Sequence, residues 1–243
     1  MWKDYELEIV YQDTYLVAVN KPTGMLVHKS LIDSKEIYFA MKIIRDQIGQ
    51  WVYPIHRLDK PTSGVLLFAL DSDTARIMNE QFLEHTIEKK YIAVVRGYIE
   101  KEGFLDYALS VKLDKIADKN SKKKQEAQEA TTSFKRLATV ELAHAVGRYE
   151  KTRYSLVELT PSTGRKHQLR RHMKHLSHHI IGDTKYGRGE HNKMVRKHYD
   201  CNRLMLHAYS LEFYHPYMKK KLILKASLDT TWKNFLHIFN FSL

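Results

Sequence analysis

The chain has 243 residues, 43% of them hydrophobic, so it can bury a large core and is not intrinsically disordered. A formal net charge of +12, with 14 histidines besides, favours a polyanionic partner such as nucleic acid; a merely basic protein is the alternative. The single cysteine, Cys201, excludes a disulfide framework and is typical of a reducing compartment. Without a long apolar run or a signal-peptide pattern at the start, we expect a cytoplasmic protein with no membrane segment.

Hydrophobic periodicity and turn residues predict the elements in chain order. We expect strands over residues 7–11, 16–20, 65–70, 91–97, 132–140, 154–160 and 204–213. The first helix is expected over residues 33–48, with Asp33 as its cap, Ile37 on its buried stripe and Gly49 closing it. Further helices are expected after the strand that follows Gly64, with Ser72 as the cap, over 166–176 and near 231–239. A charged stretch at about residues 112–128 lacks periodicity and predicts an exposed loop.

This succession of strands and helices predicts an α+β fold. We expect one domain over residues 1–243, built on an extended mixed, largely antiparallel sheet flanked by helices and loops. We expect no separate N-terminal RNA-binding module of the S4 type.

The segment His-Arg-Leu-Asp-Lys-Pro-Thr-Ser-Gly at residues 56–64 places Asp59 on a turn that leads into a buried strand. An acid held there can do chemistry, whereas an isolated turn aspartate more often caps a helix or faces water. The protein-kinase catalytic loop is a competing interpretation. It fails because Leu58 separates Arg57 from Asp59, and because Gly64 replaces the asparagine expected five residues later.

A second segment, residues 163–174, concentrates cations at the predicted start of a basic helix. They are Arg165, Lys166, Arg170, Arg171 and Lys174. Since a helix N-terminus already favours anions, this concentration suggests a bound phosphate or carboxylate, with a solvated basic face as the alternative. A third segment, Lys89-Lys90-Tyr91, opens a predicted central strand, where a tyrosine commonly packs in the core.

The histidines near this helix raise the possibility of a metal site. They are His167, His172, His175, His178 and His179. No cysteine lies nearby and no carboxylate occurs before Asp183, so we expect these histidines to face solvent or RNA instead.

Taken together, the three segments resemble the RluA-type pseudouridine synthases. The blocks at residues 8–13, 16–24, 180–187 and 203–208 extend the similarity over essentially the whole chain, with His179 departing from a proline common in relatives. The resemblance implies that Asp59 is catalytic, that Arg165 pairs with it, that Tyr91 stacks on the target base and that Arg57 fills the gap left by the flipped nucleotide. Leu169 is expected to support the active site. The expected RNA contacts are Arg57, Lys89, Lys166, Arg170, Arg171 and Lys174.

Residues 45–50, 113–119 and 164–172 are most similar to family members that modify uridine 65 at the base of the tRNA T stem. The resemblance therefore implies a tRNA pseudouridine synthase. Because the reaction needs no imported bond energy, we expect no cofactor or metal, and we expect a monomer since nothing in the sequence suggests an obligate interface. Two alternatives stay open, namely the same reaction on ribosomal RNA and a noncatalytic RNA-binding protein.

Overall fold

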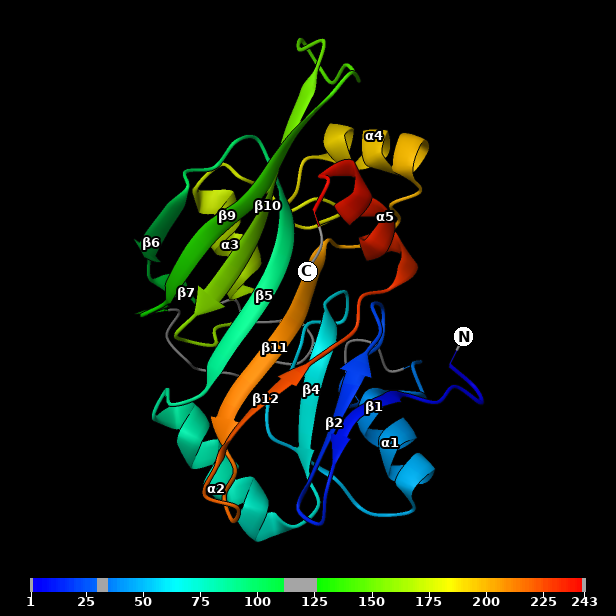
Figure 1. Cartoon of the computed structure of the whole chain (residues 1–243), viewed down its shortest axis with the longest axis vertical. Helices are drawn as coiled ribbons and strands as arrows, with labels where there is room; N and C mark the ends of the chain where they lie inside the picture. The colour runs from blue at the N-terminus through cyan, green and yellow to red at the C-terminus, as the bar shows by residue number, and fades with distance from the viewer. Residues whose placement is uncertain (1, 30–34, 112–125, 242–243) are drawn as a thin grey trace. The chain divides into compact units, whose positions relative to one another are not determined.

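The computed structural model describes residues 2–29, 35–111 and 126–241 (Figure 1). Two compact units divide the chain. The first unit comprises Met1–Lys89, Leu109–Gln128 and Ala208–Ala226, and the second comprises Lys90–Ala108, Glu129–His207 and Ser227–Leu243. Both contain helices and antiparallel strand pairs, and the predicted α+β class is confirmed. The expectation of one catalytic domain over residues 1–243 stays a prediction.

In the first unit, three antiparallel neighbours, β1 (Glu8–Gln12), β2 (Leu16–Lys21) and β4 (Ser63–Ala69), form the sheet that leads to Asp59. The other elements here are β3 (Tyr53–Pro54), β7 (Leu109–Ser110), β8 (Ala127–Gln128), β12 (Lys221–Lys225), α1 (Ala40–Ile48) and α2 (Ser72–Leu83). Every residue of β4 is buried, as its continuous apolar run predicts. One core cluster collects Leu16, Val65, Leu67 and Phe213, so β4 is a rigid base for the loop before it.

Helix α1 begins at Ala40, and the predicted start at residue 33 is wrong for the described residues from 35 onward. The backbone N–H groups of Ala40 and Met41 donate to the carbonyls of Leu26 and Val27 instead of following a preceding turn. Ile37, expected on the buried stripe, is 61% exposed. Long-range backbone pairing therefore overrides local helical periodicity here.

The helix caps show where local signals hold. Gly49 closes α1 in the left-handed region (φ 66°), as predicted. The side chain of Asp71, rather than that of the predicted Ser72, caps α2 by accepting from the Thr74 N–H (2.8 Å). The cap predicted for Asp33 lies outside the described residues.

The second unit contains an antiparallel set in the order β5 (Glu88–Arg96), β10 (Thr152–Pro161), β9 (Thr131–Leu142) and β6 (Glu102–Asp106). Its helices are α3 (Gln168–His175), α4 (Gly189–Tyr199) and α5 (Thr230–Ile238). Strand β11 (Leu206–Tyr214) begins in this unit and ends in the first. Most of the predicted charged loop, residues 112–125, lies outside the described residues.

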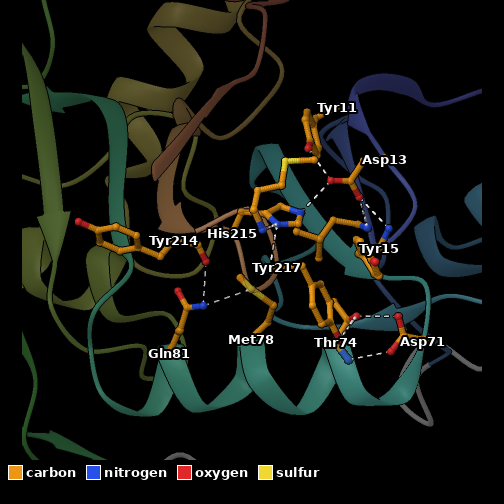
Figure 2. Close-up of polar contacts among 12 residues, drawn as sticks. Tyr11, Asp13, Tyr15, Asp71, Thr74, Met78, Gln81, Tyr214, His215 and Tyr217 are labelled. Carbon is orange, nitrogen blue, oxygen red and sulfur yellow. Dashed lines mark hydrogen bonds and ion pairs between the residues drawn. The ribbon is translucent and has the colours of Figure 1, made fainter. Parts of the chain in front are cut away.

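A buried polar network joins two turns of the first unit (Figure 2). Asp13, between β1 and β2, accepts from the Tyr11 hydroxyl (2.5 Å), from the backbone N–H of Tyr15 (2.7 Å) and from Nε2 of His215 (2.8 Å). Nδ1 of His215 in turn accepts the Met218 N–H (3.0 Å), which fixes the turn after β11. Complete pairing of this kind is what burying polar groups requires.

Candidate active site

Asp59 lies on the loop before β4, and it is partly buried between the buried Leu58 and the strand. Its backbone carbonyl accepts from the Thr62 N–H (3.0 Å), which closes the predicted turn. Gly64, at φ +117°, passes so close to β11 that a Cβ there would lie 2.2 Å from the Ala208 oxygen. Only glycine fits, so the end of this loop has one position relative to the sheet.

Lys21 connects the Asp59 loop to the turn that follows β2. This lysine is completely buried, and its ammonium donates to the carbonyls of Pro22 (2.9 Å), Met25 (2.8 Å) and Lys60 (3.2 Å). Burying an ammonium is costly unless its protons are bonded, so three carbonyls that converge on it make a rigid junction. Sequence reasoning missed this residue, although a lysine that ends an apolar strand just before Pro-Thr-Gly was a visible signal.

The turn after Lys21 adds two further bonds to the loop. The Thr23 hydroxyl donates to the Pro61 carbonyl (2.7 Å), and the Gly24 N–H donates to the Lys60 carbonyl (2.8 Å). Residues 21–25 therefore clamp the backbone immediately after Asp59. Positioning of this quality is what an active-site carboxylate needs.

The residues flanking Asp59 in sequence differ in their surroundings. Arg57 is exposed. His56 accepts the Leu67 N–H at Nε2 (3.0 Å) and stacks on Phe82, and burial, with Lys89 nearby, lowers its pKa to about 3. His56 is thus a neutral structural residue. Lys89, a predicted RNA contact, is partly buried, and this burial lowers its pKa.

In the second unit, Arg165 occupies a turn that Gln168 organises. The Gln168 Oε1 accepts the Arg165 N–H (2.9 Å), while its Nε2 donates to the Thr131 carbonyl (3.0 Å) on β9. The Arg165 guanidinium donates through Nε to the Glu129 carbonyl (2.9 Å). Helix α3 begins at Gln168 rather than at residue 166, because His167 adopts a left-handed backbone (φ 57°).

Tyr91 and Leu169 share one apolar cluster of the second unit. Tyr91 faces Leu159 across the β5–β10 ladder and is partly buried, and it packs against the cluster that contains Leu169 and Met173. The structure brings these two predicted residues together. Tyr91 is thus packed against this cluster yet partly exposed, which suits a stacking surface.

Arg170 is buried, and its guanidinium forms a fork with Asp183 through Nε–Oδ2 (2.8 Å) and Nη2–Oδ1 (2.9 Å). Oδ1 also accepts the N–H groups of Lys185 and Tyr186, each at 2.9 Å. Burial alone would raise the pKa of Asp183, but the hydrogen bonds and charge of Arg170, together with the N–H groups of Tyr186 and Lys185, lower the pKa. This geometry argues against the RNA contact predicted for Arg170, because its donors face the protein interior.

The other predicted RNA contacts on this segment reach the surface. Lys166 and Lys174 are exposed, and Arg171 is partly exposed. Two of the nearby histidines bond to neighbouring protein groups: His172 bonds to Thr132 (2.9 Å), and His179 bonds to the Tyr186 carbonyl (2.6 Å). In residues 2–29, 35–111 and 126–241, no group of three or more His, Cys, Asp or Glu side chains could hold a metal ion.

The predicted site residues are divided between the two units. Arg57, Asp59 and Lys89 belong to the first, and Tyr91, Arg165 and Leu169 belong to the second. The expected convergence of Asp59, Tyr91 and Arg165 stays a prediction. Within each unit, the contacts described above hold the Asp59 loop, Arg165 and the cluster of Tyr91 and Leu169 in place.

Known proteins match the chain in sequence and in fold. A family model described as RNA pseudouridylate synthase matches residues 15–175. Proteins named tRNA pseudouridine synthase C are similar over nearly their full length: that of Vibrio parahaemolyticus is 59% identical (94% of this chain, 93% of the relative), and that of Haemophilus ducreyi is 57% identical (96% of each).

Two solved human structures share the fold. "RNA Pseudouridylate Synthase Domain Containing 1" has a TM-score of 0.70 and 26% identity, covering 92% of this chain and 84% of its own. "RNA Pseudouridylate Synthase Domain Containing 4" has a TM-score of 0.68 and 27% identity, covering 97% and 94%. Among the described residues, no helix has the length and apolar character needed to cross a membrane.

Proposed function

Because the chain belongs to the RNA pseudouridylate synthase family, we propose that it isomerises a uridine of tRNA, at position 65 at the base of the T stem, to pseudouridine. The observation that carries the tRNA substrate is the similarity of 53–59% identity to proteins named tRNA pseudouridine synthase C. We place the reaction in the cytoplasm and assign it to a monomer.

The reaction exchanges one bond for another within a single nucleotide. The N1–C1′ glycosidic bond breaks, the uracil turns while it stays bound, and C5 bonds to C1′. C5 then loses its proton and N1 gains one, so the product is an isomer and no electrons are exchanged with another molecule. We therefore propose that the enzyme uses neither a cofactor nor a metal ion.

Asp59 starts the reaction in this proposal, either as a nucleophile toward the sugar or base or as the base that removes a sugar proton. The clamp formed by Lys21 and Thr23 supports this assignment, because it fixes the backbone next to Asp59. Arg165 keeps the Asp59 carboxylate ionised and oriented when the pocket closes on the substrate.

Base flipping requires a replacement for the lost stacking. Tyr91 stacks on the extruded uracil, with Leu169 supporting the site in the same apolar cluster. Arg57, exposed beside Asp59, fills the gap in the RNA. Flipping costs a few kcal/mol, which phosphate contacts from Lys89, Lys166, Arg171 and Lys174 offset. Arg170 is left out because Asp183 occupies its guanidinium.

Pseudouridine mapping tests the proposal. Total RNA from a host that lacks the enzyme is incubated with the wild-type protein or with Asp59→Asn. A new pseudouridine at tRNA position 65 with the wild type alone supports reaction, substrate and catalytic residue together. A new pseudouridine found only in ribosomal RNA would mean that ribosomal RNA, not tRNA, is the substrate. If the folded protein bound RNA but made no pseudouridine, a noncatalytic binding protein would be favoured.

A further inference from the structure

Helix α4 carries a row of cations that the proposed active site does not use. Lys193, Arg196 and Lys197 are all exposed, and their spacing of three and four residues places them on one face of the helix. Met194 and Val195 are buried on the opposite face. The helix thus presents a basic surface of three residues, here called the α4 basic face.

Among the residues that the structure describes, the three cations of the α4 basic face have no carboxylate in an ion pair with them. Like charges one turn apart on a helix repel each other and destabilise it. An external anion bound to this face would remove that repulsion.

The helix is held firmly enough to act as a platform. Near its start, His191 hydrogen-bonds through Nδ1 with the Tyr154 hydroxyl (2.8 Å). At its end, His198 stacks on His144 with ring centres 4.0 Å apart, and the Tyr199 hydroxyl hydrogen-bonds with Nε2 of His144 (3.1 Å). These contacts tie both ends of α4 to β10 and to the loop between β9 and β10 (Figure 1).

We propose that the α4 basic face is a docking surface for the phosphate backbone of the substrate RNA, in addition to the residues that handle the target uridine. The choice of tRNA as occupant rests on the proposed function. Charge complementarity carries the inference, since phosphate contacts position a protein on nucleic acid without reading its sequence. The planar guanidinium of Arg196 can bind one phosphate through two N–H groups, and the two lysines act as point charges beside it.

Binding measurements over a series of salt concentrations test this surface. The triple variant Lys193→Ala, Arg196→Ala, Lys197→Ala is compared with its parent, both carrying Asp59→Asn so that the tRNA is bound but not modified. Each lost phosphate contact should flatten the salt slope by about 0.7–0.9. We expect a total decrease of about 2 and a loss of affinity of roughly tenfold or more at moderate salt.

A matched control removes the same charge elsewhere. Lys101, Lys220 and Lys233 are exposed outside α4, and their triple alanine variant should change affinity and slope much less. With Asp59 intact, the α4 variant should raise KM for tRNA and leave kcat within about twofold of the parent value. Circular dichroism and thermal melting verify folding, and a glutamine triple replaces the alanine triple if the latter unfolds.

Equal losses of tRNA affinity in the two triple variants would overturn the proposal, because the loss would then follow from the lower net charge and not from the position of the cations. A fall in kcat with unchanged KM would overturn it as well. Failure of the wild type to make pseudouridine would count against the proposed function alone, since the binding comparison needs no turnover. An unchanged salt slope for the α4 variant would leave this face as ordinary solvated surface.

Discussion

Asp59 and Asp183 are acids next to glycine-containing turns, one in each unit, yet their surroundings differ. The Asp183 side chain is 1% exposed and is surrounded by donors, with Arg170 contributing a fork. Asp59 is partly exposed, and Lys21 and Gly24 hold the backbone of its loop. A carboxylate buried among donors stabilises the fold, whereas one presented on a fixed loop can meet a substrate.

The environment, rather than the residue type, separates the structural acid Asp183 from Asp59, for which we propose a catalytic role. Substitution of Asp59 should therefore remove activity and leave stability nearly unchanged. Substitution within the buried Arg170–Asp183 pair should instead lower stability and leave activity nearly unchanged.

The largest expected effect is that of Asp59→Asn. Loss of the nucleophile or base should lower the single-turnover rate of pseudouridine formation by at least about a thousandfold. The melting temperature should change little, because asparagine has nearly the same size and shape as aspartate and the backbone bonds that fix the loop remain. Rapid-quench kinetics with labelled tRNA measures the rate, and near-normal turnover would show that Asp59 is not the reactive group.

The next largest effect concerns the buried ion pair. Arg170→Met leaves Asp183 charged and unpaired in the interior, which should lower the free energy of unfolding by about 3–5 kcal/mol. Urea denaturation measures this change. The exposed pair Arg76–Glu80 on α2 is the control, since Arg76→Ala should cost no more than about 0.5 kcal/mol. Comparable losses from both variants would mean that burial does not distinguish the two pairs.

Much of the fold was predictable because local signals agree with it. The strand around β4 followed from its apolar run, and the end of α1 followed from Gly49. Helix α4 was missed because only Met194 and Val195 supply buried apolar side chains, so its sequence lacks a clear hydrophobic period. The start of α1 was misplaced because its first N–H groups pair with residues far back in the chain.

The candidate site shows the same limit. Motif spacing pointed to Asp59 and Arg165, but it did not show that Lys21 is buried beneath the Asp59 loop. Motif spacing also did not distinguish Arg170 from the other four cations of its segment, because the sequence does not show that Arg170 alone pairs with a buried acid, Asp183. Burial and partner identity depend on tertiary contacts, which residue spacing does not contain.

The surroundings of Asp13 are intermediate between those of Asp59 and Asp183. Its side chain is largely buried, but its hydrogen bonds come mainly from neutral donors. Burial alone would raise its pKa, yet the hydrogen bonds from Tyr11, the backbone and His215 lower the pKa. Its stabilisation is therefore complete above the ordinary aspartate pKa and is lost as pH falls through the lower folded value. Asp13→Asn should cost about 1–3 kcal/mol at neutral pH.

Urea denaturation from pH 7 down to pH 3 measures this contribution. The difference between wild type and Asp13→Asn should shrink as the pH falls, because the carboxylate becomes protonated in both folded and unfolded chains. Glu8→Gln is the control, since Glu8 makes an exposed bond to Asn20. A difference that stays constant over the whole range would show that the network depends on shape rather than on charge.

The smallest expected effect is that of Asp71, an acid whose role is local. It caps α2 by accepting from both the N–H and the hydroxyl of Thr74, and these bonds lower its pKa. Asp71→Ala should cost roughly 1 kcal/mol, and Asp71→Ser should recover most of that loss, because serine is also a good cap. Asp73→Ala, in the same helical turn but exposed, should cost only a few tenths of a kcal/mol. One series of urea titrations measures the free energy of unfolding of all three variants. If Asp71→Ala and Asp73→Ala lowered it equally, general helix electrostatics, rather than capping, would explain why α2 begins at Ser72.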